Sequence, residues 1–530
     1  MPIGRKKRII MYFCQKLKNM SKEVRLRFAP SPTGPLHMGG VRTALFNYLF
    51  ARKHKGSLIL RIEDTDQARF VPGAEEYIKD SLAWTGIVFD EGIDNKGEFG
   101  PYKQSERKDI YAKYIKELIE NDKAYYAFDT PERLDKIRKE YEAKGEVFMY
   151  NYKSRSTLEN ATNLPTEEVE KRVNRGDKYV IRFKIPENKT INIQDIIRGN
   201  IEINTKTLDD KVLMKSDGLP TYHLANIIDD HLMKISHVIR GEEWLPSLPL
   251  HNLLYEAFDW EKPEFAHLPL ILKPVGKGKL SKRDGAKMGF PVFPMEWFDK
   301  KSNEIFAGYK EEGYFPESFV NLLALLGWNP GTEQEVFTMD ELIKLFDLER
   351  VNKSGAKFDP EKAKWFQHQH LQRKSNDALV DLFMPILQEE LGYTIEGKAI
   401  RDYSKKVIDL LKERATFIKD FWEQGRFFYM EPTEYTAKAI KKQWKETTPD
   451  LMLEIINILT NIDTWKANYI KEEISDWITK KEIGFGKVMQ PLRLSLVGAL
   501  QGPDLFVILE MLGKDESIKR IKNAVDNIKK

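Results

Sequence analysis

The segment Pro30–Gly40 reads Pro-Ser-Pro-Thr-Gly-Pro-Leu-His-Met-Gly-Gly and separates two segments of different periodicity. Residues 24–29 alternate between apolar and polar side chains, as in a β-strand, whereas apolar residues over 41–49 recur at helical spacing. A second apolar run over 57–62 follows and ends in the acidic segment 63–66. This order predicts a βαβ unit whose ligand-binding loop lies at the carboxyl end of the first strand.

The composition of this loop suits an anionic ligand. Its three prolines restrict the backbone, while Gly34, Gly39 and Gly40 allow a ligand to approach without meeting a Cβ atom. Amides at the start of the following helix form a site for phosphate, and His37 adds a donor. The loop lacks the spacing of the two commoner nucleotide-binding motifs. From these residues alone, a proline-rich turn without a ligand remains the alternative.

A second informative segment follows a strand-like run at 268–272. Residues 279–283 read Lys-Leu-Ser-Lys-Arg, and four cations fall within the seven residues 277–283. Composition alone favours a solvated surface loop. The other interpretation is a loop whose Lys279, Lys282 and Arg283 close over the phosphates of a nucleotide.

Together the two segments resemble a known family. Residues 27–34 with 37–40 resemble the ATP-binding "HIGH" region of class I aminoacyl-tRNA synthetases, in the form carried by glutamyl-tRNA synthetases, with Gly40 in place of the last histidine. Residues 279–283 are similar to the "KMSKS" loop of that class and come in the required order. The resemblance runs from about Ser21 to the C-terminus. It implies an α/β fold: a Rossmann-like parallel-sheet catalytic domain with an α/β insertion, followed by an all-α anticodon-binding region.

The resemblance also implies the reaction. Glutamate and ATP would form glutamyl-AMP and pyrophosphate, and the glutamyl group would pass to the 3′-terminal ribose of tRNA(Glu). A carboxylate is already ionised at pH 7, so the chemistry needs positioning and fixed positive charge. Mg²⁺ would accompany ATP. The implied catalytic residues are His37, Lys279, Ser281, Lys282 and Arg283, and the implied ATP-binding residues are Pro30, Ser31, Thr33, Gly34, His37, Gly39, Gly40 and Lys282.

By the same resemblance, Arg27 would bind the side-chain carboxylate of glutamate and Glu63 would face its amino group. The implied glutamate-binding residues are Arg27, Ala29, Ser31, Glu63, Tyr222, Asn226, Arg240 and Trp244. Each has a plainer interpretation: Arg27 as an outward strand residue, Glu63 as a helix cap, Tyr222 and Asn226 as a helix face packed on the core. For residues 229–231, Asp-Asp-His, we expect a solvated or capping cluster in preference to a metal site.

The chain divides into six predicted segments. They are an N-terminal extension (1–20), the first half of the catalytic domain (21–124), an acceptor-end-binding insertion (125–221), the second catalytic half (222–265), a stem-contact region with the Lys-Leu-Ser-Lys-Arg loop (266–358) and a helical anticodon-binding region (359–530). In the insertion, Gly199-Asn200 predicts a two-residue hairpin loop. Few strands are expected after Phe290.

Two helices are predicted from their ends in the last segments. Thr338 and Glu341 form a capping-box pattern that opens a helix over 340–348, and Gly392 ends a helix over 377–391. The resemblance implies anticodon-binding residues Arg414, Gln490, Arg493 and Leu505. The alternative for Gly502-Pro503 beside them is a turn against the core.

Composition narrows the class of protein. The 530 residues are 41% apolar and 31% charged without an 18-residue apolar run, which indicates a soluble, multidomain protein with no membrane partner. The single cysteine, Cys14, excludes an internal disulfide and a thiolate zinc cluster, which some glutamyl enzymes carry. A net charge of +4 requires local basic patches for RNA. Residues 1–20 look like an upstream extension and not a targeting segment. We expect a cytoplasmic monomer.

Three rivals stay open at this point. A glutaminyl-tRNA synthetase would have a β-barrel C-terminal half. An RNA-binding protein with an inactive synthetase core would lack adenylate formation, and a truncated homologue that glutamylates a modified base would lack the helical C-terminal region. Whether tRNA(Gln) is also charged is open, although Arg414 points to tRNA(Glu).

Overall fold

The computed structural model describes residues 23–528. The predicted extension 1–20, with Cys14, lies outside the described residues. The chain forms two compact units, Met1–Phe366 and Gln367–Lys530. No helix within residues 23–528 is long and apolar enough to cross a membrane.

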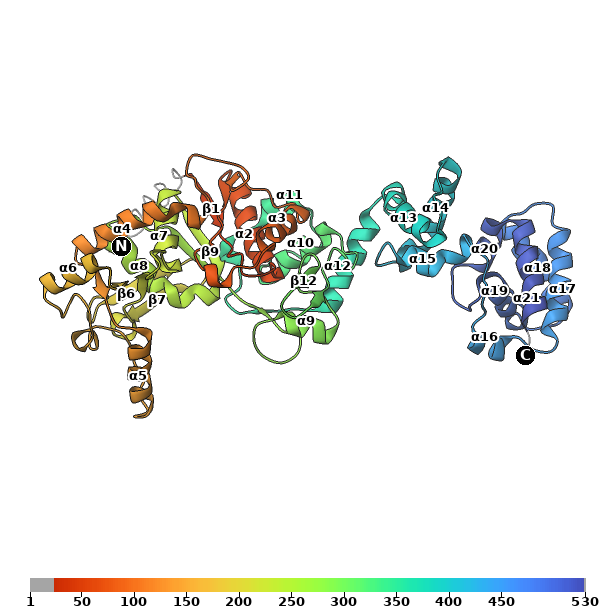
Figure 1. Ribbon diagram of the computed structural model, residues 1–530. Coiled ribbons are helices and arrows are strands. Elements are labelled where there is room, and N and C mark those ends of the chain that lie inside the picture. The colour runs from red at the N-terminus through yellow and green to blue at the C-terminus, as the bar shows by residue number, and fades with distance from the viewer. Residues whose placement is uncertain (1–22, 529–530) are drawn as a thin grey trace, which may run out of the picture. The chain divides into compact units, whose positions relative to one another are not determined.

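The predicted βαβ unit is present in the first unit (Figure 1). Strand β1 (Arg25–Phe28) pairs in parallel with β2 (Ser57–Leu60), and helix α2 (Met38–Lys53) connects them. Strand β2 continues the sheet to β3 (Glu91–Gly92). Strand β1 is buried throughout and no residue of α2 is exposed, so even the polar positions of the alternating strand face protein and not solvent.

The second half of the catalytic sheet lies beside β1. Helix α7 (Tyr222–Leu232) leads to β9 (His237–Gly241), which pairs in parallel with β10 (Glu264–Leu268) after α8 (Leu248–Ala257). The Ser236 amide donates to the Arg25 carbonyl at 2.9 Å, which joins the two halves at β1 and β9. The carboxyl ends of β1 and β9 therefore meet at one edge, as the parallel-sheet prediction requires.

A hairpin from the intervening segment extends this sheet. Strand β6 (Thr190–Asp195) pairs with β10 and, in antiparallel fashion, with β7 (Gly199–Asn204). The predicted Gly199-Asn200 loop is wrong, because the turn is 196–198. The carboxylate of Asp195 accepts the backbone N–H groups of Ile197 and Arg198 at 3.0 and 2.8 Å and so ends the strand before that turn.

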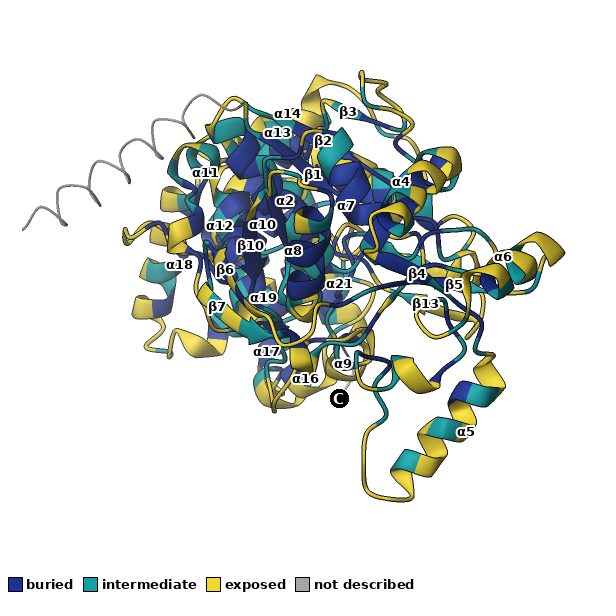
Figure 2. Ribbon diagram, turned by 90° about the vertical axis from the view of Figure 1, so that its left-hand side faces the viewer, coloured by how far each residue is buried: buried dark blue, intermediate teal, exposed yellow. Residues whose placement is uncertain are grey.

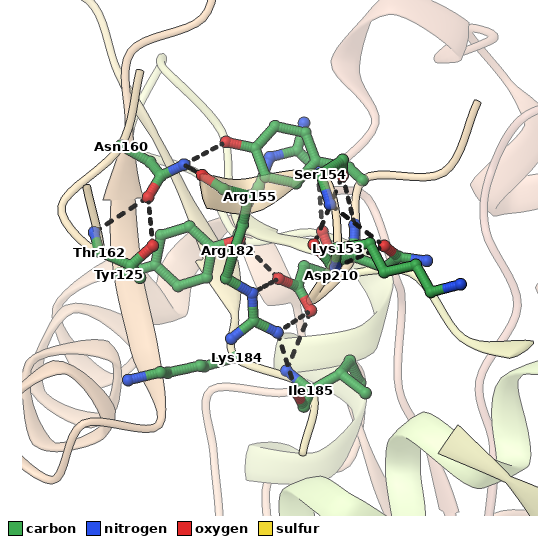
Figure 3. Close-up of polar contacts among 12 residues, drawn as sticks. Tyr125, Lys153, Ser154, Arg155, Asn160, Thr162, Arg182, Lys184, Ile185 and Asp210 are labelled. Carbon is green, nitrogen blue, oxygen red and sulfur yellow. Dashed lines mark hydrogen bonds and ion pairs between the residues drawn. The ribbon is translucent and has the colours of Figure 1, made fainter. Parts of the chain in front are cut away.

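The rest of the intervening segment forms its own small sheet. It consists of β4 (Ala124–Ala127), β5 (Val180–Phe183) and β8 (Val212–Met214), all antiparallel. Its helices are α5 (Pro131–Glu142) and α6 (Thr166–Arg175), and Figure 2 shows α5 projecting from this unit with mostly exposed residues. Asp210 holds the segment together: Figure 3 shows Tyr125 and Arg155 directed at its carboxylate, at 2.6 and 3.0 Å.

The first unit contains further helices and short strands. They are α3 (Ala74–Trp84), α4 (Lys108–Glu120), β11 (Ile271–Leu272) paired with β14 (Ala356–Lys357), α9 (Lys282–Met288), the hairpin of β12 (Trp297–Asp299) and β13 (Glu304–Phe306), α10 (Pro316–Leu325), α11 (Met339–Leu345) and α12 (Pro360–Arg373), which continues into the second unit. The capping box of Thr338 and Glu341 is formed as predicted.

The second unit is helical, and no strand occurs among the described residues 367–528. Gly392 ends α13 (Asn376–Leu391) in the left-handed conformation, as predicted. The other helices are α14 (Lys398–Leu411), α15 (Asp420–Gly425), α16 (Ala437–Gln443), α17 (Thr448–Thr460), α18 (Ala467–Lys480), α19 (Gly486–Val497), α20 (Leu505–Leu512) and α21 (Lys514–Asn527). This composition agrees with the predicted all-α C-terminal region and not with the β-barrel of the glutaminyl rival.

Candidate active site

His37 stands at the N-cap of α2 with its two ring nitrogens in different roles. Nδ1 accepts the backbone N–H of Gly39 at 3.2 Å, which leaves the ring proton on Nε2. Nε2 is buried and has no hydrogen-bond partner in the structure. Burial, and secondarily the charge of Lys279, lowers the pKa of His37 to about 4. His37 therefore offers a neutral N–H donor at pH 7.

The two sequence motifs meet at this histidine. The Met38 amide donates to the carbonyl of Val292, which follows α9 in the chain, at 2.9 Å, and the His37 ring packs edge-on against Phe293 at 5.9 Å. Leu36 and Leu280 belong to the same buried apolar cluster. The loop at 30–40 and the loop at 279–283 are thus neighbours on one side of the sheet.

Carboxylates hold the lysines of the cationic loop. Lys279 Nζ lies 2.9 Å from Glu243 Oε1, and Lys282 Nζ lies 3.2 Å from Asp299 Oδ2 on β12. All three of the predicted cations, including Arg283, are exposed. These exposed ion pairs are weak enough to exchange for another anion.

Ser281 has a local role in the structure. Its backbone N–H and hydroxyl both donate to Asp284 Oδ2, at 3.0 and 2.5 Å, as in a capping box that starts α9. The hydroxyl thus stabilises the turn from which Lys282 projects.

A buried ionic network surrounds Arg27. Its guanidinium donates from two nitrogens to the two carboxylate oxygens of Asp230, at 3.3 and 3.4 Å. Arg61 bridges Asp230 at 2.7 Å and Glu63 at 2.9 Å, and Asn226 donates to Glu63 at 3.1 Å. Burial raises the pKa of Glu63, and the charge of Arg61 offsets this rise only in part. At Asp230, the charges of Arg27 and Arg61 outweigh the effect of burial and lower the pKa. Neither Arg27 nor Glu63 is an outward or capping residue.

The expectation for residues 229–231 is wrong in part. Asp229 and Asp230 are fully buried and not solvated, because arginines neutralise both: Arg107 Nε donates to Asp229 at 2.7 Å. His231 turns away and stacks on Trp260 at 3.7 Å. Sequence reasoning missed Arg61 and Arg107. The sequence signals were that Arg61 lies inside the apolar run 57–62 and that Arg107 follows the turn at Pro101.

Arg240 organises a second polar cluster on β9. Its NH1 donates to the Tyr222 hydroxyl at 2.9 Å and to His251 Nδ1 at 3.2 Å, and Trp244 packs on the Tyr222 ring at 4.1 Å. The remaining guanidinium nitrogen, NH2, is buried without a hydrogen-bond partner in the structure. An unused buried donor of this kind fits a substrate carboxylate.

The other predicted loop residues differ in their exposure to solvent. Ser31 and Thr33 are exposed, and Ala29, Pro30, Gly34 and Gly39 are half-buried. Packing also favours glycine at position 40, in addition to the predicted approach of a ligand, because a Cβ atom there would lie 2.5 Å from the Leu36 side chain. Glu63 N–H donates to the Pro30 carbonyl at 3.0 Å, which fixes the loop against the end of β2.

In the helical unit, two predicted residues converge. Arg414 NH1 donates to the Gly502 carbonyl at 3.0 Å and Arg493 NH1 to the neighbouring Pro503 carbonyl at 2.7 Å. Burial, and then the charge of Arg414, lowers the pKa of Arg493. Gln490 is half-buried. Leu505 is buried in the helical core, so its side chain is not available to a ligand as predicted.

Within residues 23–528, no group of three or more histidine, cysteine, aspartate or glutamate side chains could hold a metal ion. The acidic side chains of the site are already paired with arginines or lysines. The cations that could meet a nucleotide are Lys279 on a loop and Lys282 and Arg283 at the start of α9, and a Mg²⁺ ion would therefore depend on the phosphates it accompanies.

Comparisons with known proteins cover both units. Residues 23–365 match the family model described as "tRNA synthetases class I (E and Q), catalytic domain", and residues 378–525 match an "Anticodon binding domain". Relatives named glutamate–tRNA ligase include those of Christiangramia forsetii, 59% identical over 96% of this chain and 100% of the relative, and Flavobacterium johnsoniae, 58% identical over 96% and 99%.

Solved structures agree with these matches. A crystal structure of a glutamate tRNA ligase from Elizabethkingia meningosepticum in complex with its amino acid is 55% identical, with a TM-score of 0.92 over 96% of this chain and 100% of that chain. A glutamate-tRNA synthetase from Elizabethkingia anophelis, also 55% identical with the same coverage, has a TM-score of 0.88. The sequence-based family prediction is confirmed: the chain belongs to the class I tRNA synthetases of the E and Q group.

Proposed function

We propose that this protein is a glutamate–tRNA ligase. It activates L-glutamate with ATP to give glutamyl-AMP and pyrophosphate, then transfers the glutamyl group to the 3′-terminal ribose of tRNA(Glu) with release of AMP. The observation that carries this proposal is the unused NH2 donor of Arg240, buried on β9, which lies beside the strand β1 that leads to His37. Full-length relatives at 59% identity that bear this name support it.

The amino-acid pocket is built from the two buried arginines. Arg27 and Arg240 face the side-chain carboxylate of glutamate, with Tyr222 and Asn226 beside them. Ala29, Ser31 and Trp244 complete the walls, and Glu63 faces the substrate ammonium group. Glutamine would leave a buried guanidinium without an anion. By comparison with other buried ion pairs that lose one partner, this would cost about 3–5 kcal/mol in binding free energy. The pocket therefore selects the acid over the amide.

The nucleotide lies between the two motifs. His37 donates its Nε2–H to a phosphate oxygen, assisted by the loop Pro30, Ser31, Thr33 and Gly34. The amides of Gly39 and Gly40 already donate to His37, so these two glycines contribute by placing no side chain beside the nucleotide. Lys279, Lys282 and Arg283 leave their resting positions to bind the β- and γ-phosphates, and Ser281 supports Lys282. Mg²⁺ bound to ATP would share the phosphate charge.

Catalysis follows from placement and charge. The α-carboxylate of glutamate attacks the α-phosphorus, the bond to the bridging oxygen of pyrophosphate breaks, and no general base is needed because the nucleophile is already an anion. Fixed cations offset the repulsion between the two anions and the charge that develops on pyrophosphate.

The tRNA would contact both units. Residues 125–221 hold the acceptor end, residues 266–358 contact the stem, and the helical region from 359 binds the anticodon through Arg414, Gln490 and Arg493. An arginine can stack on a base or bind its edge. We propose that the protein acts as a cytoplasmic monomer and prefers tRNA(Glu) to tRNA(Gln).

Aminoacylation by the purified full-length protein tests this function. With ATP, Mg²⁺ and tRNA(Glu), we expect pyrophosphate release and charging with glutamate but not glutamine. Charging with glutamine alone would favour the glutaminyl rival, and tRNA binding without pyrophosphate release would favour an inactive core. A parallel reaction with tRNA(Gln) decides whether the enzyme discriminates between the two tRNAs.

A further inference from the structure

Behind Arg240, three neighbouring strands each contribute one buried polar side chain. Arg240 on β9 is in register with His267 on β10, and Asp195 ends the adjacent strand β6. The three side chains are 4%, 0% and 3% exposed. Arg240 Nε donates to His267 Nε2 at 3.0 Å, and His267 Nδ1 lies 2.6 Å from Asp195 Oδ2.

The hydrogen bonds fix the tautomer of His267. Arginine can only donate, so His267 Nε2 must be the acceptor and Nδ1 must carry the proton. Asp195 Oδ2 accepts the hydrogen bond from this Nδ1–H group. Its other oxygen, Oδ1, already accepts the N–H groups of Ile197 and Arg198, so the carboxylate cannot rotate away.

These contacts fix the orientation of the Arg240 guanidinium group. A planar guanidinium whose Nε is held by His267 and whose NH1 is held by Tyr222 and His251 has its remaining nitrogen fixed in direction. That nitrogen is NH2, the donor without a partner in the structure. His267 lies behind Arg240, on the side of the Asp195 hairpin.

We propose that His267 and Asp195 are positioning residues for the amino-acid substrate: His267 orients Arg240 toward the side-chain carboxylate, and Asp195 keeps His267 in the tautomer that can accept from Arg240. This inference rests on the proposed function, in which Arg240 binds glutamate. It assigns the β6–β7 hairpin a part in substrate selection through Asp195.

Asp195→Asn is the decisive variant because it has nearly the same shape. The Oδ1 atom of the asparagine would keep the two backbone amides, so its NH2 group must face His267 Nδ1. This reverses the tautomer and places an Nε2–H against the Nε–H of Arg240. We expect the KM for glutamate to rise about tenfold or more, with kcat and the KM for ATP changed less than threefold.

His267 variants give a matched series. His267→Phe keeps a ring but removes the acceptor and should raise the KM for glutamate as Asp195→Asn does. His267→Gln places a carbonyl oxygen near the same point and should restore much of the affinity. His237→Gln, on β9 with Arg240 but without a contact to it, should behave as the wild type.

A spectroscopic measurement separates this inference from the proposed function. The ¹⁵N shifts of the His267 ring in the unliganded full-length protein should identify an Nδ1–H tautomer, and Asp195→Asn should convert it to Nε2–H. An unchanged KM for glutamate in Asp195→Asn, or a loss of kcat alone, would overturn the inference. Failure of the wild type to charge glutamate would instead overturn the proposed function, and the tautomer result would stand independently.

Discussion

Arg27 on β1 and Asp230 on α7 form a two-point ion pair that is almost completely inaccessible to solvent, with side chains 4% and 1% exposed. The pair joins the first and second halves of the catalytic domain across 203 residues. Asp230 also binds Arg61, so one carboxylate orients two guanidinium groups. The arginine that we assign to glutamate is thereby held from behind, which frees its other edge for substrate.

Asp230→Asn should therefore affect both folding and glutamate binding. Removing the anion leaves two buried guanidinium groups undercompensated, which costs about 3–5 kcal/mol in unfolding free energy. We expect a lower urea midpoint and a raised KM for glutamate. Asp177→Asn, at the exposed pair with Arg175, is the control and should leave both unchanged. Equal stability of the Asp230 variant and the control would show that the pair is not needed.

His37 caps helix α2 through Nδ1 and offers an Nε2–H donor, and two substitutions separate these roles. In His37→Asn the side-chain oxygen can still accept from Gly39, so stability should be kept, while adenylate formation should fall roughly a hundredfold without the Nε2–H donor. His37→Ala should lose the same activity and, in addition, about 1 kcal/mol of stability. Tritiated-glutamate adenylate assays with tRNA present, and urea unfolding, measure the two effects. Full activity in His37→Asn would contradict a donor role.

The sequence predicted those parts of the site that depend on residues close to one another along the chain. The loop at 30–40, the helix after it and the cap at Thr338 follow from local periodicity and backbone preferences, and the structure contains all three. His37 could be singled out because it stands at a strand-to-helix turn.

Partners across the sheet could not be predicted in this way. The alternation of β1 suggested a half-exposed strand, yet Arg25 and Arg27 are buried because carboxylates from other elements neutralise them. Asp229 and Asp230 looked like solvated acids for the same reason: their arginines lie on β1, directly after β2 and in the segment before α4. The hairpin loop was misplaced because Asp195 binds backbone amides, which strand propensity does not report.

Lys282→Ala should remove adenylate formation, roughly a hundredfold in rate, while tRNA affinity stays within a few-fold. Lys282 lies at the start of α9, where it pairs with Asp299 and lies over the Phe306 ring at 5.0 Å; its own side chain is exposed, so its substitution should not affect the fold. Lys287→Ala, an exposed lysine of the same helix, is the matched control and should retain full activity. Pyrophosphate release with ATP, glutamate and tRNA measures the rate. An active Lys282→Ala enzyme would exclude the loop from the chemistry.

Arg414→Ala should weaken tRNA(Glu) binding about tenfold and leave the KM for glutamate unchanged, since the residue is exposed and lies in the helical unit. Filter binding at fixed salt measures the affinity. Arg401→Ala, which removes another exposed arginine of the same unit, controls for the loss of one positive charge. Equal losses in the two variants would indicate only a general charge effect.

The lowered pKa of His37 predicts a pH-dependent stability. The unfolded chain binds a proton at this residue below about pH 6.5, whereas the folded protein does so only near pH 4, so this contribution is complete above pH 6.5 and is lost as the pH falls toward 4. Between these values it amounts to about 1.4 kcal/mol of unfolding free energy per pH unit. His37→Asn lacks the titrating group and should lose less stability on acidification than the wild type. Urea unfolding followed by tryptophan fluorescence at pH 7.0, 6.0 and 5.0 measures the difference. If the two proteins lost stability in parallel, His37 would have to take up its proton in the folded state near its ordinary pKa, and the neutral donor assigned to it would be wrong.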